Sequence, residues 1–241
     1  MKTPRGASAQ STSAAAPEPQ APAALQRTKA DYDKTRPFGA WAWYLPAGKS
    51  WASDNADAIP YVSGADGTSA DRIEYSGSVW KSAVRTYYWP KAGSLSFFAY
   101  SPYDNLSGTV GCTRKDGATL SGYDISSQCD FLVADPALDK TSAEATYGLN
   151  GVPTLFRHTL AKVTVRATLE KLLTEGTKKV TITNVTLKNL YLKGDYKYSS
   201  SPQWSSLSES LGNQTLTDFS KDIATVDVIE LGSIFVIPQS F

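Results

Sequence analysis

Residues 155–167 read LFRHTLAKVTVRA, and residues 180–187, after a polar link, read VTITNVTL. Every second residue of Phe156–Leu160 lies on one face of an extended chain, because side chains alternate sides along a strand. The apolar alternation resumes one residue out of phase at Val163, and a bulge near 161–162 would correct the phase. In the second segment Val and Ile alternate with Thr, which suits a pleated strand better than a helix. The sequence therefore predicts two long strands.

Shorter segments elsewhere also have the composition of strands. A Lys-Asp-Gly turn at 115–117 predicts a tight hairpin between two of them. One helical stretch of about two turns is predicted over Leu169–Glu175. The other predicted strands are apolar or aromatic and end at turn signals, and they cover residues 38–44, 79–80, 86–90, 95–100, 109–113, 118–125, 131–134, 223–229 and 234–237. Many short strands separated by turns are typical of an all-β sandwich or barrel.

The composition is that of a globular chain without a strong electrostatic preference. Of the 241 residues, 41% are hydrophobic and 11% are aromatic, enough for one large all-β domain or two small ones. The 24 basic and 23 acidic residues give a formal net charge of +1, so neither nucleic acid nor an anionic membrane is indicated as a partner. No apolar run approaches the roughly 20 residues that a membrane-spanning helix needs.

The first thirty residues differ from the rest of the chain. Residues 7–25 are mostly Ala, Ser, Pro and Gln without an aromatic residue, so residues 1–30 are predicted to be a disordered tail. A single domain is predicted over 31–241. Lys2 and Arg5 resemble the charged start of a secretion signal, but no apolar segment of roughly 7–15 residues follows them. An export signal is therefore not visible.

Six motifs occur in order over roughly residues 38–239. They are FGAWA (38–42), YWP with LSFFAYSP (88–90 and 95–102), QCDFLVA (128–134), FRHTLAKV (156–163), VTL through GDY with Trp204 (185–187 and 194–196), and VIPQ (236–239). In this order they resemble the motifs of the fimbrillin family. Its members are lipoprotein-derived subunits of type V pili and related surface adhesins of Gram-negative anaerobes.

The resemblance implies a transthyretin-like β-sandwich of the Greek-key type with about seven or more strands. It also implies a structural and adhesive role at the cell surface, in the outer membrane or fimbrium, with other fimbrial subunits as partners. A host or microbial surface protein or glycan is a further class of partner. In the family, a trypsin-like protease removes an early strand, and the open groove accepts a strand from the next subunit. No cofactor, metal or catalytic residue is implied.

Two arginines lie where the resemblance places proteolytic processing. Arg36 precedes Pro37, which resists trypsin-like cleavage, so Arg27 is the preferred site, and an ordinary solvated arginine is the alternative for either residue. Fimbrillins are similar to one another in a lipid-anchored cysteine near the N-terminus and commonly in a second sandwich domain. Here the first cysteine is Cys112 and the chain stops at Phe241. We therefore expect an N-terminal domain without its export signal, its lipid anchor and its partner domain.

The sequence contains no motif for catalysis or cofactor binding, such as GxSxG, a P-loop or a dinucleotide fingerprint. His158 is the single histidine, which excludes a multi-histidine metal cluster, and its spacing from Phe156 favours a core or sheet-face residue with a hydrogen-bonded ring. Four aspartates in one long loop offer oxygen ligands for calcium, but their spacing fits no calcium motif and solvated turns are the ordinary alternative: Asp54, Asp57, Asp66 and Asp71. The sequence predicts a protein that is not an enzyme.

The two cysteines are candidates for a disulfide. Cys112 and Cys129 lie 17 residues apart, which is too far for a CxxC redox or zinc pattern. The hairpin predicted between them would bring them together, and a disulfide suits an exported protein. Two free, buried thiols are the alternative.

The tryptophans support a rival function, a secreted carbohydrate-binding β-sandwich that uses exposed aromatic rings. Four of the six tryptophans lie in apolar or aromatic strands, where core packing is the ordinary role: Trp41, Trp43, Trp80 and Trp89. Trp51 and Trp204 lie in polar surroundings and are candidates for a sugar-stacking platform. A glycosidase would need two carboxylates about 5–10 Å apart, which a sequence does not show.

Overall fold

A computed structural model describes most of the chain after the first thirty residues. The described ranges are residues 31–143, 151–170, 179–198, 203–207, 211–216, 220–224 and 226–239. All helices and strands named below belong to the unit Asp33–Phe241. The predicted disordered tail, residues 1–30, lies outside the described residues, and so does most of the predicted helix at 169–175.

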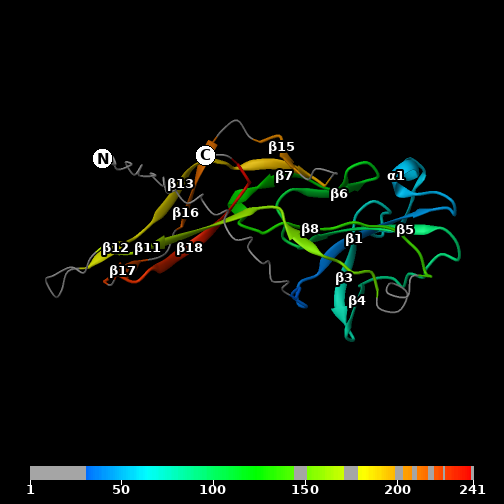
Figure 1. Cartoon of the computed structure of the whole chain (residues 1–241), viewed down its shortest axis with the longest axis horizontal. Helices are drawn as coiled ribbons and strands as arrows, with labels where there is room; N and C mark the ends of the chain where they lie inside the picture. Colours follow the sequence, from blue (N-terminus) through cyan, green and yellow to red (C-terminus); the bar gives the residue numbers. More distant parts are fainter. Residues whose placement is uncertain are drawn as a thin grey trace, which may run out of the picture. The chain divides into compact units, whose positions relative to one another are not determined.

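The larger sheet, called sheet A, contains eight antiparallel strands (Figure 1). Their order is β10-β8-β5-β1-β3-β4, with β2 paired to β1 and β9 paired to β5. The bounds are β1 Phe38–Leu45, β2 Ile59–Val62, β3 Asp71–Ser76, β4 Val79–Ser82, β5 Ser94–Ser101, β8 Leu132–Ala134, β9 Ala137–Lys140 and β10 Phe156–His158. Strands β1 and β5 lie in the middle of this sheet, where their aromatic and small side chains are mostly buried.

The smaller sheet, called sheet B, has the order β15-β14-β7-β6. Its strands are β6 Thr109–Thr113, β7 Gly117–Asp124, β14 Lys193–Lys197 and β15 Gln203–Ser205. The β6–β7 hairpin is the one predicted from the Asp-Gly signal: Thr113 pairs with Gly117, whose φ of +67° suits glycine at this turn. The short helical elements are α1 Trp51–Asp54, η1 Asn55–Asp57 and η2 Ile125–Ser127.

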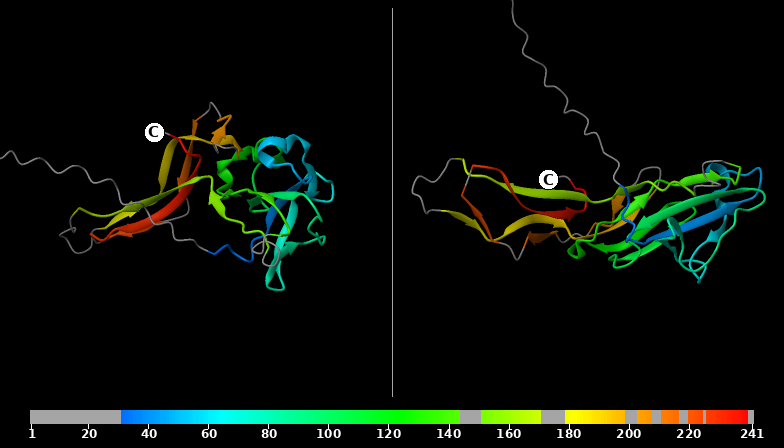
Figure 2. Two further views of the ribbon diagram at one scale, coloured as in Figure 1. Left: turned by 45° about the vertical axis from the view of Figure 1, so that its right-hand side comes forward. Right: turned by 90° about the horizontal axis from the view of Figure 1, so that it is seen from below.

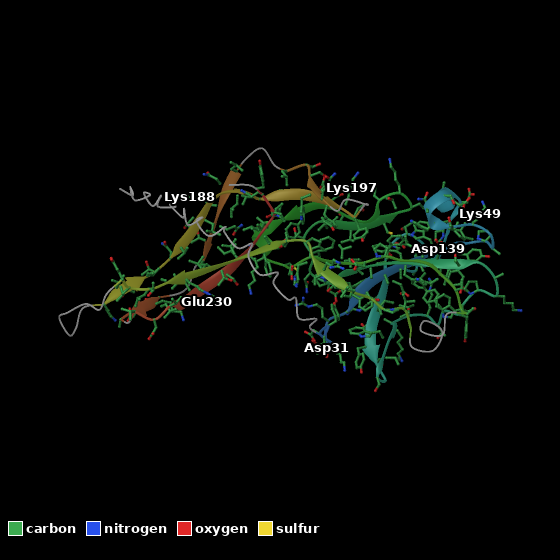
Figure 3. The ribbon with its side chains drawn as sticks, in the orientation of Figure 1. Asp31, Lys49, Asp139, Lys188, Lys197 and Glu230 are labelled. Carbon is green, nitrogen blue, oxygen red and sulfur yellow. The ribbon has the colours of Figure 1, made fainter. Side chains whose placement is uncertain are left out.

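Three two-stranded ribbons complete the fold. They pair β11 Ala161–Ala167 with β18 Ile229–Val236, β12 Val180–Ile182 with β17 Lys221–Ile223, and β13 Val185–Tyr191 with β16 Leu211–Leu216. The β11–β18 and β13–β16 ribbons lie as two layers (Figure 2, right). They meet closely at Gly232, where an added Cβ would come within 3.2 Å of the Leu216 side chain. Polar side chains such as Lys188 on β13 and Glu230 on β18 are exposed to solvent (Figure 3).

The hydrophobic core lies between sheets A and B. Phe131, which is fully buried, places its ring 6.4 Å from that of Tyr100 on β5 and 5.6 Å from that of Tyr196 on β14. In the same core, Trp51 of α1 packs on Phe98 of β5 at 5.1 Å between ring centroids. Two sheets that face each other across one core confirm the all-β, sandwich-like prediction, whereas the transthyretin-like name rests on the resemblance alone.

The phase slip in the stretch 155–167 has a different cause from the predicted one. The chain changes sheet there: β10 pairs with β8 in sheet A, and β11 begins at Ala161 and pairs with β18. The Thr159 N–H and hydroxyl both donate to the Phe131 carbonyl, at 3.1 and 2.9 Å. These two hydrogen bonds fix the backbone at the crossing, the point where the chain passes from sheet A to the β11–β18 ribbon. The predicted bulge near 161–162 is therefore wrong, and the register shift occurs later, between Val165 and Arg166.

Three further strand predictions need correction. The predicted strand over 223–229 is wrong, because β17 ends at Ile223 and β18 begins at Ile229. Residues 180–187 form parts of two strands, β12 and β13, which pair with different partners. Residues 86–90 form no strand: Trp89 instead packs edge-on against Phe97 of β5, with ring centroids 5.8 Å apart. Pro90 has no N–H to donate to a strand partner, and this disfavours a regular strand here.

Replacing Tyr123 by Phe should lower the stability of the sandwich. Tyr123 is fully buried, and its hydroxyl donates to the Cys129 carbonyl at 2.8 Å. Tyr123→Phe leaves that part-buried carbonyl without this donor, so we expect a loss of about 1–2 kcal/mol in the free energy of unfolding, measured by urea denaturation. Tyr88→Phe is the control, because Tyr88 is 77% exposed. Equal stability of the two variants would contradict the assigned role of this hydrogen bond.

Candidate interaction surface

The β11–β18 ribbon has open edges. Among the strands that the structure describes, β11 and β18 pair with each other alone. The inward side of β18 is apolar, with Leu231, Ile234 and Val236 buried, and Val163 and Val165 of β11 are half-buried. The polar residues of β11 alternate with these and are exposed. An open strand edge beside apolar rows is a surface to which a further strand can be added.

Two glutamine side chains take the place of backbone partners in this region. Gln128 receives the Phe235 N–H on its Oε1 at 2.8 Å and donates from Nε2 to the Phe235 carbonyl at 3.1 Å. Gln239 receives the Tyr191 N–H at 2.9 Å and donates to the Asn189 carbonyl at 2.8 Å, across the irregularity in β13. Both residues belong to the motifs quoted above, but the motifs gave no indication of these partners.

A cleft lies beside the Phe235 end of β18. Its volume is about 640 Å³, and it is lined by Asp33, Thr35, Arg36, Pro37, Pro102, Asp104, Asn105, Gln128, Cys129, Asp130 and Phe235. Arg36, one of the two candidate processing sites, is exposed in this lining, in a turn closed by a 3.1 Å hydrogen bond from its N–H to the Asp33 carbonyl. Arg27, the other candidate, lies outside the described residues.

Asp130 in this cleft is paired with the single histidine. Its Oδ2 lies 2.6 Å from Nδ1 of His158, and its Oδ1 is buried without a partner among the described residues. Burial raises the pKa of Asp130, and the neighbouring His158 partly offsets this effect. The His158 side chain is 67% exposed on β10, so it is a sheet residue with a hydrogen-bonded ring and not a core residue.

The four aspartates of the long loop do not converge on one site: three have hydrogen-bond or ion-pair partners nearby in the sequence, and the fourth is buried. The Asp54 carboxylate accepts from the Ser50 N–H, Asp57 pairs with Lys49, and Asp66 accepts from the N–H groups of Thr68 and Ser69. The hydrogen bonds to its turn lower the pKa of Asp66 to about 2. Asp71 is buried at the start of β3. Within the described residues, these carboxylates form no joint metal site.

The two tryptophans proposed for sugar stacking are packed within the protein. Trp51 is only 8% exposed. Trp204 lies 5.4 Å from the rings of both Tyr123 and Tyr196, and its Nε1–H donates to the Thr159 carbonyl at 2.8 Å. The interpretation of these residues as a sugar platform is wrong, because polar sequence neighbours do not show which ring packs against another strand. Among the residues that the structure describes, the strongly exposed aromatic side chain is instead that of Tyr88.

Both cysteines are free thiols in the structure, Cys112 on β6 and Cys129 just after η2. Burial raises the pKa of Cys112 to about 12, with a small opposing effect from the Trp43 side chain. Burial also raises the pKa of Cys129, and Arg36 opposes it. A disulfide between the two cysteines stays a prediction from the sequence.

The comparisons with known proteins identify the family. The profile of the fimbrillin-like family matches residues 28–241. This chain belongs to the fimbrillin-like family. Among solved structures, this fimbrillin-like chain is similar to a Bacteroides uniformis protein with a provisional cell-adhesion description, at 16% identity and a TM-score of 0.54. That similarity covers 86% of this chain and 69% of the other, and at this identity it shows a shared fold alone. A search of the curated proteins finds no match.

The fimbrillin-like chain shows no membrane-spanning helix in its described part: none of the helices there combines the necessary length with an apolar composition.

Thiol reactivity tests the environment of the two cysteines. A thiolate is the reactive form, so at pH 8 a thiol with a pKa near 12 is almost entirely protonated and inert. We expect Cys112 to react with a maleimide at least about a hundredfold more slowly than a small-molecule thiol, and Cys129 to react at an intermediate rate. Cys112→Ser and Cys129→Ser assign the two phases.

The same assay on unfolded, unreduced protein shows whether Cys112 and Cys129 are free thiols or form a disulfide. Two reactive thiols per chain would establish free cysteines, and none would establish the disulfide.

Proposed function

We propose that this chain is a structural and adhesive cell-surface protein, a fimbrillin-like pilus subunit or tip adhesin, that assembles by strand addition between subunits. The observation that carries this proposal is the open β11–β18 ribbon in a member of the fimbrillin-like family. The partners would be other fimbrial subunits, and the place of assembly the outer membrane or fimbrium. The function needs no cofactor and no catalytic residue, so the protein is not proposed to be an enzyme.

The physical basis of strand addition is the unpaired backbone of an edge strand. Each hydrogen bond formed along such an edge contributes roughly 0.5–1.5 kcal/mol, so several in succession stabilise a contact that depends little on side-chain identity. Alternate side chains of the added strand would meet the apolar row of β18, which includes Ile234 and Val236, and this sets the register. A polymer that is held mainly by backbone groups needs no specialised site residues.

Proteolytic processing is the proposed trigger. Arg27 and Arg36 precede β1, and Arg36 is exposed in its turn. A proline directly after Arg36 disfavours cleavage there, so Arg27 is the proposed site.

Treatment of the full chain with a trypsin-like protease tests this function. We expect cleavage after Arg27, followed by oligomers that resist SDS, with size followed by light scattering and the new end identified by N-terminal sequencing. Arg27→Ala should abolish both cleavage and assembly, whereas Arg36→Ala should leave both unchanged. A trimmed protein that stays monomeric at high concentration would overturn assembly by strand addition.

A carbohydrate-binding role is the second candidate, and one surface favours it. Tyr88 is 77% exposed, and its carbonyl accepts the Tyr61 hydroxyl at 2.5 Å. The Tyr61 ring lies 6.3 Å from that of Tyr44, and exposed Ile59 is a neighbour in β2. Half-exposed aromatic rings of this kind can stack on the apolar face of a sugar.

A glycan array tests the carbohydrate-binding role. If it is correct, the array gives specific signals that Tyr88→Ala reduces at least about tenfold and that Trp204→Phe, a packed control, leaves unchanged. Equal signals from the wild-type chain and Tyr88→Ala would reject this surface.

A further inference from the structure

The Gln128 side chain binds the β18 backbone as a peptide unit of a neighbouring strand would. Its amide exchanges two hydrogen bonds with one residue, Phe235, receiving the N–H and donating to the carbonyl. The same Nε2 also donates to the Ile125 carbonyl at 2.9 Å. Gln128 itself has φ +48° at the end of η2, where its own N–H donates to Ile125 at 2.9 Å. Hydrogen bonds therefore fix both the backbone of Gln128 and the amide group at the end of its side chain.

These two bonds identify the side of β18 that is open. The N–H and carbonyl of one strand residue point toward the same side. Since those of Phe235 reach Gln128, they point away from β11, although Phe235 lies opposite Lys162 in the pairing. By the alternation of the strand, the backbone of Ser233 points the same way.

The open side continues from Gln128 toward the start of β18. Among the residues that the structure describes, no hydrogen bond reaches the Ser233 backbone on this side. Beyond Ser233, the register with β11 shifts, because Gly232 lies opposite Val165 and Glu230 opposite Arg166. A bulge of this kind disrupts the strand pairing locally and increases the twist of the edge. The edge is thus capped at its Phe235 end and open at Ser233.

We propose that Gln128 is a positioning residue that marks where an extended segment of a second copy of this chain stops pairing along β18. The proposal rests on the strand addition proposed above, and it adds the edge and the end point of the pairing. The occupant is an extended backbone because the edge already holds one amide in that arrangement. A side-chain amide at Phe235 excludes a backbone amide from the same position, so pairing includes Ser233 and ends before Phe235.

The added segment would leave the sheet at the cleft. Gln128 and Phe235 both line the cleft of about 640 Å³. A chain that stops pairing at Gln128 meets this space directly and does not run into the packed core. The lining is mostly polar: Asp104 pairs with Arg72, Asp130 pairs with His158, and Arg36 is exposed there, so a polar residue suits that point of the segment.

Hydrogen exchange of the full chain and two variants, before and after protease-induced assembly, tests the proposal. Gln128→Asn keeps the amide but shortens the side chain by one methylene, so it no longer reaches Phe235. Gln128→Glu keeps an oxygen that receives the Phe235 N–H. In the free chain, Gln128→Asn should lower the protection of the Phe235 amide about tenfold, whereas Gln128→Glu retains it. Gln203→Asn on β15 is the matched control, because this glutamine is exposed.

The amide protection measured in the oligomers distinguishes the possible outcomes. In wild-type oligomers the Ser233 amide should gain protection while that of Phe235 stays unchanged, and in Gln128→Asn oligomers both should gain protection. Far-ultraviolet circular dichroism and unchanged exchange in sheet A confirm that the variants are folded. Oligomers with new protection on β13 or β16 and none on β18, or with the same pattern in wild type and Gln128→Asn, would overturn the role of Gln128 but not strand addition. The absence of oligomers from every variant would overturn both.

Discussion

Phe131 connects sheet A, sheet B and the segment that leads to the ribbons, and the rest of the structure depends on these contacts. Its ring lies in the core between Tyr100 of sheet A and Tyr196 of sheet B, and it is fully buried. Its carbonyl accepts both hydrogen bonds from Thr159, at the point where the chain leaves sheet A for the ribbons. One residue thus joins the two sheets through its side chain and directs the crossing through its backbone. Loss of the ring would leave a cavity between the sheets, and this is among the most destabilising changes that a core can undergo.

Beyond that crossing, β14 and β15 join sheet B, and the other strands form two-stranded ribbons. A two-stranded ribbon leaves the outer backbone groups of both strands without strand partners, and proteins protect such edges in several ways. Here Gln128 and Gln239 supply side-chain amides to the backbone of β18 and β13, and a bulge interrupts β18. These features make parts of the edges unavailable and leave other parts open. The strand addition proposed above would need this combination, because an unprotected edge would also pair with unrelated chains.

The surface chemistry of the described residues agrees with a structural role. Asp66 in the long loop accepts backbone hydrogen bonds within its turn. Arg157 of β10 and Asp135, which directly follows β8, form a two-bond ion pair with both distances 2.6 Å. His158 is exposed and bonded to Asp130, which is itself partly buried in the cleft. These pairs connect β10 with residues on either side of β8. They stabilise the geometry of the edges and do not require a small-molecule substrate to explain them.

The sequence by itself determined the fold class, the β6–β7 hairpin and the family. Alternation and turn residues depend on near neighbours in the chain, so Gly117, the apolar row of β5 and the end of β18 at residues 234–236 could be recognised without coordinates. The tertiary structure alone decided which strands pair. It showed that the phase slip before Ala161 is a change of sheet, that Trp204 packs on Tyr123, and that Gln128 reaches Phe235 over 107 residues. Partners that are distant in sequence are selected by packing and by the need to satisfy buried backbone groups, and neither leaves a local pattern.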